Sequence, residues 1–251
     1  MTAGMGHAVY RQGSRRQAPC SGRIAAGGIV AALRVIAVDT SSERASVALV
    51  EGGEARGEVR LATSLPSVAV LPAIDLLLRS SGLAPSDVDG YAVTLGPGSF
   101  TGVRVGLSTV QGLALGGSRP CVGLSTLDVL AAGVAGEADS LAVLVDAFRE
   151  EVFVGRYDRD ARPLAAPTRA RPEVALAGLP PGTLLTGDGA WRYESLVRER
   201  LPEARLVRGE RFLAARLGRL AEAALERGEG VPPASLRPLY LRDADVRPSR
   251  P

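Results

Sequence analysis

The sequence of 251 residues predicts an α/β fold with two lobes, each built from a mixed sheet and flanking helices. Apolar runs of strand type that end in aspartate occur twice, at residues 34–39 and 141–146. Each run is followed by a further strand of a meander, and later by a strand that passes through Gly-x-Gly into a helix. A repeat this long indicates duplication of one ββαβ-type unit, because solenoid repeats are shorter and more numerous. We therefore expect two similar lobes with a cleft between them.

The first half contains the meander and the first long helix. Strands are expected at residues 45–50 and 57–61, with a turn at Glu51-Gly52-Gly53 between them. A helix is expected over residues 68–80, because its apolar residues recur at helical spacing and Gly82 follows in the usual position past a helix end. Further apolar residues widen the apolar arc of this helix beyond one stripe, which indicates that the helix buries more than one face. These residues are Val68, Val70, Leu76 and Leu77.

The stretch from Gly96 to Gly106 has the sequence Gly-Pro-Gly-Ser-Phe-Thr-Gly-Val-Arg-Val-Gly. It lies between an apolar strand at residues 91–95 and a helix expected over residues 103–116. One interpretation is a loop whose N–H groups cradle a phosphate at a helix N-terminus. The other is a tight turn whose glycines allow close packing, since glycine lacks a Cβ. A lone glycine pattern does not decide between these interpretations. Ser99 is expected to cap the helix N-terminus.

The second half repeats this order of elements. Strands are expected at residues 141–146, 151–157 and 183–186, and the last leads through Gly187-Asp188-Gly189 into a helix that begins near Trp191. A final helix with one apolar face is expected over residues 212–227.

These elements give the expected domain boundaries. The first lobe is expected at residues 33–120 and the second at residues 121–243, with a tail at residues 244–251. Residues 1–32 are expected to be a disordered or misannotated extension, since their apolar part has no good cleavage spacing for an export signal.

The charge distribution argues against a dedicated nucleic-acid binder. The formal net charge is +3, of which +5 falls in residues 1–34, and this leaves −2 for the rest of the chain. Aromatic residues make up only 4% of the chain, so a stacking platform is not expected either. No segment has the roughly 20 apolar residues that a membrane-spanning helix needs, and we expect a cytoplasmic protein.

The residues for metal or protease chemistry are missing from the predicted lobes. The only histidine is His7, in the extension, so neither a histidine-ligated metal site nor a Ser-His nucleophile can be built there. We expect no catalytic residue and no metal site. The two cysteines, Cys20 and Cys121, are too few for a disulfide framework, and Cys121 is expected to be buried as a small apolar residue.

Two strand-end aspartates in a duplicated fold resemble the actin, sugar-kinase and Hsp70 ATPase superfamily, whose lobes have a ribonuclease H-like fold. Within this superfamily, four motifs are similar to the TsaB family, the bacterial subunit of tRNA threonylcarbamoyladenosine synthesis. The resemblance covers residues 33–243. The motifs are Val38-Asp39-Thr40-Ser41, the stretch Gly96-Pro97-Gly98-Ser99-Phe100-Thr101-Gly102-Val103-Arg104, the run from Leu144 to Phe153, and Leu239-Tyr240-Leu241-Arg242.

The resemblance implies a non-catalytic subunit that dimerises with and activates its paralogue TsaD. TsaD transfers threonylcarbamoyl to N6 of adenosine 37 in tRNAs that read codons starting with A. A further ATPase, TsaE, joins the complex, and tRNA would be bound only through the complex. The resemblance also leaves open a homodimer of this chain alone.

The dimer interface that the resemblance implies lies on the helices expected at residues 68–80 and 103–116. This favours the packing interpretation of the glycine stretch. The same apolar residues could instead form the core of the chain itself. The expected interface residues are Val68, Leu71, Ile74, Leu78, Phe100, Val103, Arg104, Leu107 and Val110.

The superfamily resemblance also indicates where a nucleotide would lie, with weak or vestigial binding of ATP or ADP. The alternative is structural, because turn oxygens satisfy backbone N–H groups and strand-to-helix turns need glycine for ordinary reasons. An autonomous ATPase or kinase is therefore the alternative function, ahead of a peptidase or a tRNA-binding module. The candidate nucleotide-binding residues are Asp39, Thr40, Ser41, Asp146, Gly187 and Gly189.

Overall fold

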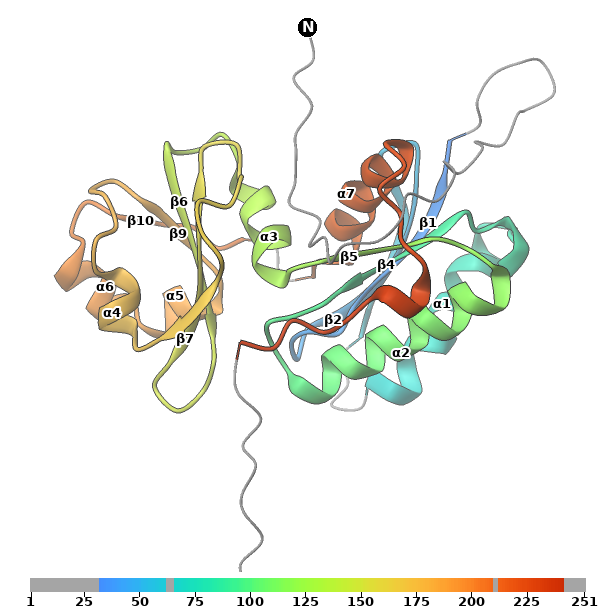
Figure 1. Ribbon diagram of the computed structural model, residues 1–251, viewed down its shortest axis with the longest axis horizontal. Helices are drawn as coiled ribbons and strands as arrows, with labels where there is room; N and C mark the ends of the chain where they lie inside the picture. The colour runs from blue at the N-terminus through green and yellow to red at the C-terminus, as the bar shows by residue number, and fades with distance from the viewer. Residues whose placement is uncertain (1–31, 62–65, 210–211, 242–251) are drawn as a thin grey trace, which may run out of the picture.

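The computed structural model describes residues 32–61, 66–209 and 212–241, and the expectations for residues 1–31 and for the tail at residues 244–251 lie outside the described residues. The described chain forms two lobes side by side, each around a five-stranded mixed sheet (Figure 1). The strand orders are β3-β2-β1-β4-β5 and β10-β9-β6-β7-β8. Corresponding strand pairs run in the same relative directions in the two sheets, so the predicted duplication is confirmed.

The first sheet is centred on β1, which is buried on both faces because four apolar residues follow one another. Ile36 and Val38 belong to one apolar core and Val35 and Ala37 to another, as the alternation of side chains along a strand requires. Strands β1 and β2 are antiparallel, whereas β1, β4 and β5 are parallel. The strands are β1 (Arg34–Asp39), β2 (Ala45–Glu51), β3 (Glu54–Leu61), β4 (Gly90–Thr94) and β5 (Cys121–Leu124).

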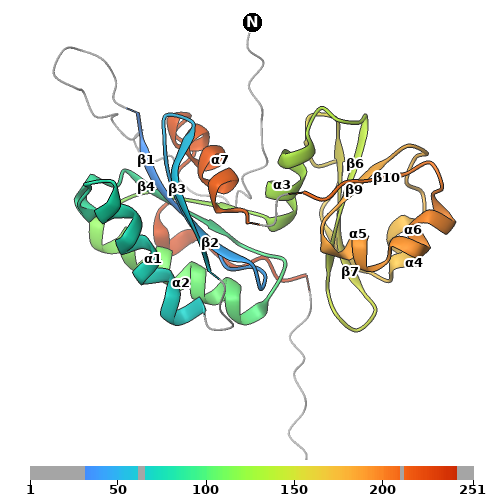
Figure 2. The ribbon, with the colours of Figure 1, turned by 180° about the vertical axis from the view of Figure 1, so that it is seen from behind.

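Long helices cover both faces of the first sheet. α1 (Pro66–Ser80) and α2 (Phe100–Gly117) lie together on one face, and α7 (Ala214–Glu226) lies on the other (Figures 1 and 2). The Glu222 carboxylate of α7 accepts hydrogen bonds from the backbone N–H groups of Gly52 (2.6 Å) and Gly53 (2.7 Å), and so ties α7 to the β2–β3 turn. Short 3₁₀ helices flank this lobe at η1 (Pro85–Asp87) and η3 (Pro233–Ser235).

The second sheet has smaller helices. α3 covers the face that holds Leu141 and Val143, and α4, α5 and α6 cover the face that holds Ala142 and Leu144. The strands are β6 (Ser140–Asp146), β7 (Val152–Asp158), β8 (Thr168–Ala170), β9 (Leu184–Thr186) and β10 (Arg205–Leu206). The helices are α3 (Thr126–Ala131), η2 (Ala132–Val134), α4 (Pro172–Leu176), α5 (Asp188–Arg192) and α6 (Glu194–Arg200).

Three sequence expectations differ from the structure. The second lobe does not begin at residue 121, because β5 is the outer strand of the first sheet. The final helix, α7, also packs on the first sheet, because its apolar face meets β1 and β2. The helix expected near Trp191 begins at Asp188, directly after Gly187, and a second helix follows it. Within the described residues, no helix is long and apolar enough to cross a membrane.

Candidate functional site

Asp39, at the end of β1, is completely buried. Its Oδ1 accepts hydrogen bonds from the Ser41 backbone N–H (3.1 Å), the Ser41 hydroxyl (2.7 Å) and the Thr94 hydroxyl (2.7 Å). Its Oδ2 has no hydrogen-bond partner among the described residues. Burial raises the pKa of the Asp39 carboxyl, and the hydrogen bonds from Thr94 and Ser41 oppose this shift. The carboxyl is therefore held by hydroxyl and N–H donors of the chain itself, in a buried position that disfavours its charged form.

The glycine stretch packs directly on the loop that follows Asp39. A Cβ at Gly102 would overlap the Thr40 carbonyl oxygen, and a Cβ at Gly98 would overlap that of Ser41. The Thr40 hydroxyl donates a hydrogen bond of 2.7 Å to the Gly102 carbonyl. The Ser99 hydroxyl accepts from the Gly102 N–H at 3.2 Å, so the predicted helix cap is confirmed. This geometry favours the packing interpretation of the glycines over a phosphate cradle.

Asp146, at the corresponding end of β6, lies in a different environment. Its Oδ2 is 2.9 Å from Arg192 Nη1, and its Oδ1 accepts a hydrogen bond from the Phe148 N–H at 3.2 Å. These contacts hold a turn in which Phe148, Arg149 and Glu150 all have φ between 52° and 61°, a conformation uncommon outside glycine. Asp146 is thus a partly exposed ion-paired group that shapes a turn.

Gly187 and Gly189 lie where α5 approaches β6. A Cβ at Gly187 would overlap the Leu144 carbonyl oxygen, and a Cβ at Gly189 would lie 3.0 Å from the Leu144 carbonyl carbon. Asp188 lies between these two glycines, and its Oδ1 accepts a hydrogen bond of 3.0 Å from the Asp146 backbone N–H. Burial raises the pKa of Asp188. The second pair of glycines, like the first, allows a helix to pack on a strand end.

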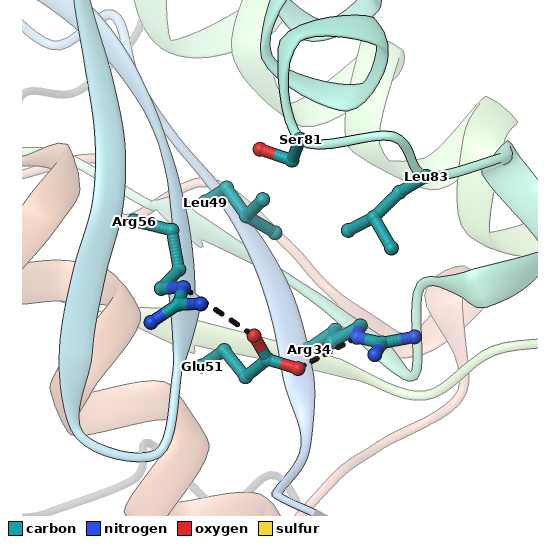
Figure 3. Close-up of a pocket in the computed structure, with 6 residues that line it drawn as sticks. All are labelled: Arg34, Leu49, Glu51, Arg56, Ser81 and Leu83. Atoms are coloured by element: carbon teal, nitrogen blue, oxygen red, sulfur yellow. Dashed lines mark hydrogen bonds and ion pairs between the residues drawn. The ribbon is translucent and has the colours of Figure 1, made fainter.

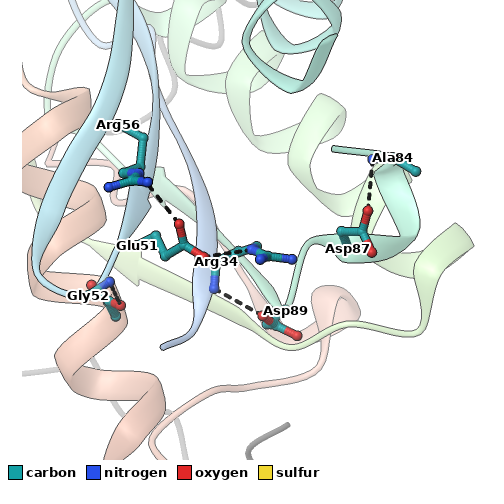
Figure 4. A network of polar contacts seen from close by, with 8 residues as sticks. Arg34, Glu51, Gly52, Arg56, Ala84, Asp87 and Asp89 are labelled. Atoms are coloured by element: carbon teal, nitrogen blue, oxygen red, sulfur yellow. Dashed lines mark hydrogen bonds and ion pairs between the residues drawn. The ribbon is translucent and has the colours of Figure 1, made fainter. Parts of the chain in front are cut away.

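Two surface pockets of the described residues are lined neither by the strand-end aspartates nor by these glycines. The larger, of about 420 Å³, lies between β1–β3 and the end of α1, and in it Arg34 and Arg56 point toward Glu51 (Figure 3). The Glu51 carboxylate accepts a hydrogen bond of 2.7 Å from the Arg34 side chain at Nε. The backbone N–H of Arg34 donates a hydrogen bond of 3.0 Å to the Asp89 carboxylate (Figure 4). These arginines are thus paired with carboxylates. The smaller pocket, of about 210 Å³, is lined by Glu150, Arg171, Pro172, Glu173 and Tyr193.

The expected interface residues divide into two groups. Five apolar residues of α1 and α2 are buried within the first lobe, because they face the sheet, and the structure thus corrects their assignment to an exposed interface. These are Ile74, Leu78, Val103, Leu107 and Val110. Val68, Leu71 and Phe100 are exposed, and so is Arg104.

The sequence analysis missed other members of the exposed surface. Leu76 and Leu115 are 57% and 71% exposed. Leu76 already stood outside the single apolar stripe of α1, whereas Leu115 had no such signal. Arg104 does not project freely: its guanidinium lies 3.8 Å from the centre of the Phe100 ring, and its Nε donates a hydrogen bond of 2.7 Å to the Tyr240 hydroxyl.

Two further titratable groups have shifted pKa values. The Tyr157 hydroxyl donates a hydrogen bond of 2.8 Å to Asp128 Oδ1. Burial raises the pKa of Asp128 to about 6 and also raises the pKa of Tyr157. Cys121 is a buried free thiol, as predicted, and burial raises its pKa to about 12. In the part of the chain that the structure describes, no group of three His, Cys, Asp or Glu residues could hold a metal ion.

These observations define a duplicated two-lobed protein of the actin-like ATPase fold. Component A of (R)-2-hydroxyglutaryl-CoA dehydratase from Acidaminococcus fermentans shares this fold at 9% identity and a TM-score of 0.50. The solved structure of YeaZ from Pseudomonas aeruginosa is 34% identical, with a TM-score of 0.71, over 83% of this chain and 100% of that chain. The chain belongs to the TsaB family, because that structure matches over its full length and bacterial proteins named TsaB are 32–39% identical to this chain over about half of it.

Curated relatives and a family model agree with this assignment. The tRNA threonylcarbamoyladenosine biosynthesis protein TsaB of Escherichia coli is 38% identical over 130 residues, which are 51% of this chain and 56% of that protein. The corresponding protein of Haemophilus influenzae is 39% identical over 130 residues, 51% of this chain and 55% of that protein. The chain thus spans about half the length of the curated relatives that it matches. The model of the family described as TsaD, tRNA N6-adenosine threonylcarbamoyltransferase, matches residues 60–182.

Proposed function

We propose that this chain is a non-catalytic subunit in tRNA threonylcarbamoyladenosine biosynthesis, which binds the paralogous transferase TsaD and activates it. The names of the TsaB relatives support the pathway. The complex, with TsaE as a further member and the tRNA bound through it, follows from the family resemblance.

The observation that carries this proposal is the exposed apolar face of α1 and α2, the α1–α2 face. Large apolar side chains on it are more than half exposed, although both helices also bury a full apolar stripe against the sheet. We infer that these side chains contact another protein chain, because exposed apolar surface on a folded protein often marks an interaction site. The apolar residues of this face are Val68, Leu71, Leu76, Phe100 and Leu115.

Two glycines of α2 strengthen the argument. A Cβ at Gly112 or Gly116 would meet no atom within 4 Å, so the packing of this chain does not require glycine there. A glycine inside a helix costs roughly 0.5–1 kcal/mol relative to alanine. Residues four apart lie on one helix face, so these glycines would let a partner helix approach closely.

The non-catalytic part of the proposal is supported by the strand ends. The carboxyl of Asp39 is buried and bonded to the chain's own hydroxyls, and Asp146 is paired with Arg192. At both strand ends the glycines are in close contact with backbone or side-chain atoms of the chain itself.

The experiment measures binding to TsaD and threonylcarbamoyl transfer to tRNA with TsaD and TsaE present. We expect Leu71→Glu, Leu115→Glu and Gly112→Arg each to weaken binding at least 100-fold and to abolish the stimulation of transfer. Each side chain is exposed or faces open space, so the thermal unfolding of the chain alone should change little. A charged residue in place of Val103 would be uninformative, because Val103 is only 3% exposed and the substitution would destabilise the core of the chain itself.

The matched control for Gly112→Arg is Ser195→Arg, which adds the same positive charge to an exposed position of α6 in the other lobe. It should leave binding and transfer unchanged. Normal binding and transfer by all three face variants would refute the proposal.

An autonomous ATPase or kinase is the second candidate function. It is favoured only by the presence of one strand-end aspartate in each lobe. It requires ATP turnover by the isolated chain that disappears in the Asp39→Asn, Asp146→Asn double variant. We expect no such turnover, and its presence would overturn the non-catalytic assignment.

A further inference from the structure

Residues 236–241 form an extended segment, the strap, that follows α2 toward its N-terminus. Just ahead of it, Gln111 Nε2 donates a hydrogen bond of 2.8 Å to the Pro233 carbonyl. Further along, the Leu239 N–H donates to the Leu95 carbonyl at 2.7 Å. At the start of α2, the Tyr240 hydroxyl accepts from Arg104 Nε. The strap is thus attached at successive points from the middle of α2 to its first turn.

The apolar side chains of the strap belong to different lobes. Leu236 is buried in the core of the first lobe between the sheet, α1 and α2, and Leu239 packs against the same core. Leu241 packs against the core of the second lobe, which holds Val145 and Phe153. Only Tyr240 lies between Leu239 and Leu241, and this spacing gives a reach of roughly 7 Å in an extended chain. A connection this short leaves little freedom between the two cores.

An exposed cluster of three side chains holds the strap in this path. The Tyr240 ring centre lies 5.4 Å from that of Phe100, and the Arg104 guanidinium lies over both rings. Phe100 and Tyr240 remain 56% and 46% exposed. We call Phe100, Arg104 and Tyr240 the aromatic–arginine cluster.

We propose that the strap fixes the two lobes in one relative arrangement, and that the aromatic–arginine cluster holds the strap in place. Loss of the cluster would release the Leu239–Leu95 hydrogen bond and the Leu241 contact together, because Tyr240 lies between these two residues. The inference goes beyond the proposed function, since it concerns the chain without a partner. If the proposed function also holds, a partner on the α1–α2 face would contact the cluster through Phe100.

The experiment uses the full chain and two readouts. Spin labels at Glu54→Cys in the first lobe and Ser195→Cys in the second, with Cys20→Ser, report the distribution of distances between the lobes. Hydrogen exchange reports the protection of the Leu239 N–H. We expect Tyr240→Ala to broaden the distance distribution and to speed exchange at Leu239 at least tenfold. Tyr240→Phe keeps the ring and loses only the hydroxyl, so its effect should be smaller on both readouts.

The control is Phe148→Ala, which removes another exposed aromatic side chain, on the β6–β7 turn. It should change neither readout. Faster exchange in Tyr240→Ala with an unchanged distance distribution would overturn the proposal. The strap would then detach without any change in the relative arrangement of the lobes. Unchanged exchange would overturn it as well, whatever the distances, because the cluster would then not hold the strap.

Discussion

The two lobes share one topology but use the aspartate at the end of the first strand differently. In the first lobe Asp39 is fully buried and accepts hydrogen bonds from Ser41 and Thr94. In the second lobe Asp146 is partly exposed and forms an ion pair with Arg192. The duplicated topology therefore fixes where the carboxyl lies, while the surroundings in each lobe decide whether hydroxyl groups or an arginine contact it.

The helices of the two lobes also differ, in their length. α1 and α2 have 15 and 18 residues, whereas α4, α5 and α6 have 5, 5 and 7. Short helices can bury one stripe against their sheet, but α1 and α2 are long enough to carry an outer apolar face as well. The α1–α2 face is therefore present on only one of the two equivalent units.

The largest expected difference in the free energy of unfolding is between alanine variants of the two strand-end aspartates. Asp39→Ala leaves buried hydroxyl and N–H donors without an acceptor, and should lower the free energy of unfolding by roughly 3 kcal/mol. Asp146→Ala removes a partly exposed ion pair and should cost only about 1 kcal/mol. Urea unfolding of both variants measures the difference. Asp39→Asn keeps an acceptor and should cost less than Asp39→Ala. Equal costs for the two alanine variants would contradict the contrast between the lobes.

A second prediction concerns Asp128, the half-buried acid of α3. Burial raises the pKa of Asp128 from 3.8 to about 6, so the folded state disfavours the ionised form. The contribution of Asp128 to stability is therefore fully present below about pH 4 and is lost as the pH rises through about 6. Asp128→Asn keeps an acceptor for the Tyr157 hydroxyl without the charge, and should raise the free energy of unfolding at about pH 7.5 by roughly 2–3 kcal/mol.

Thermal unfolding at neutral and acid pH tests this expectation. The advantage of Asp128→Asn should disappear near pH 4, where Asp128 is protonated in the folded state. A variant that is equally stabilised at both pH values would show that the ionisation of Asp128 is not the cause.

The smallest expected effect distinguishes glycines within α2. Gly112→Ala adds a methyl group in open space and should raise the free energy of unfolding by about 0.5–1 kcal/mol. Gly102→Ala should destabilise the chain instead, because its Cβ would overlap the Thr40 carbonyl oxygen. Urea unfolding distinguishes the two signs. Destabilisation by Gly112→Ala would mean that this glycine serves the fold, and would remove one support of the proposed interface.

Much of the fold followed from local patterns. The apolar runs of β1 and β6 and the periodicity of α1 and α2 depend only on neighbouring residues, and they predicted the duplication correctly. The placement of β5 and α7 could not be predicted in this way. β5 adds to an open edge of the first sheet and α7 covers its remaining face, and both the edge and the face exist only in the assembled lobe.

The features of the candidate site can also be divided into those predicted from local sequence and those decided by tertiary packing. The sequence by itself determined the strand-end aspartates, the glycine turns, the Ser99 cap and the lack of a histidine outside the extension, because each is a matter of residue type and spacing. Only the tertiary structure decided which apolar residues of α1 and α2 face the sheet and which face outward. It alone joined Asp128 to Tyr157 and Arg104 to Tyr240, 29 and 136 residues apart. Contacts between residues so distant in sequence leave no periodic signal, because they depend on how whole elements pack.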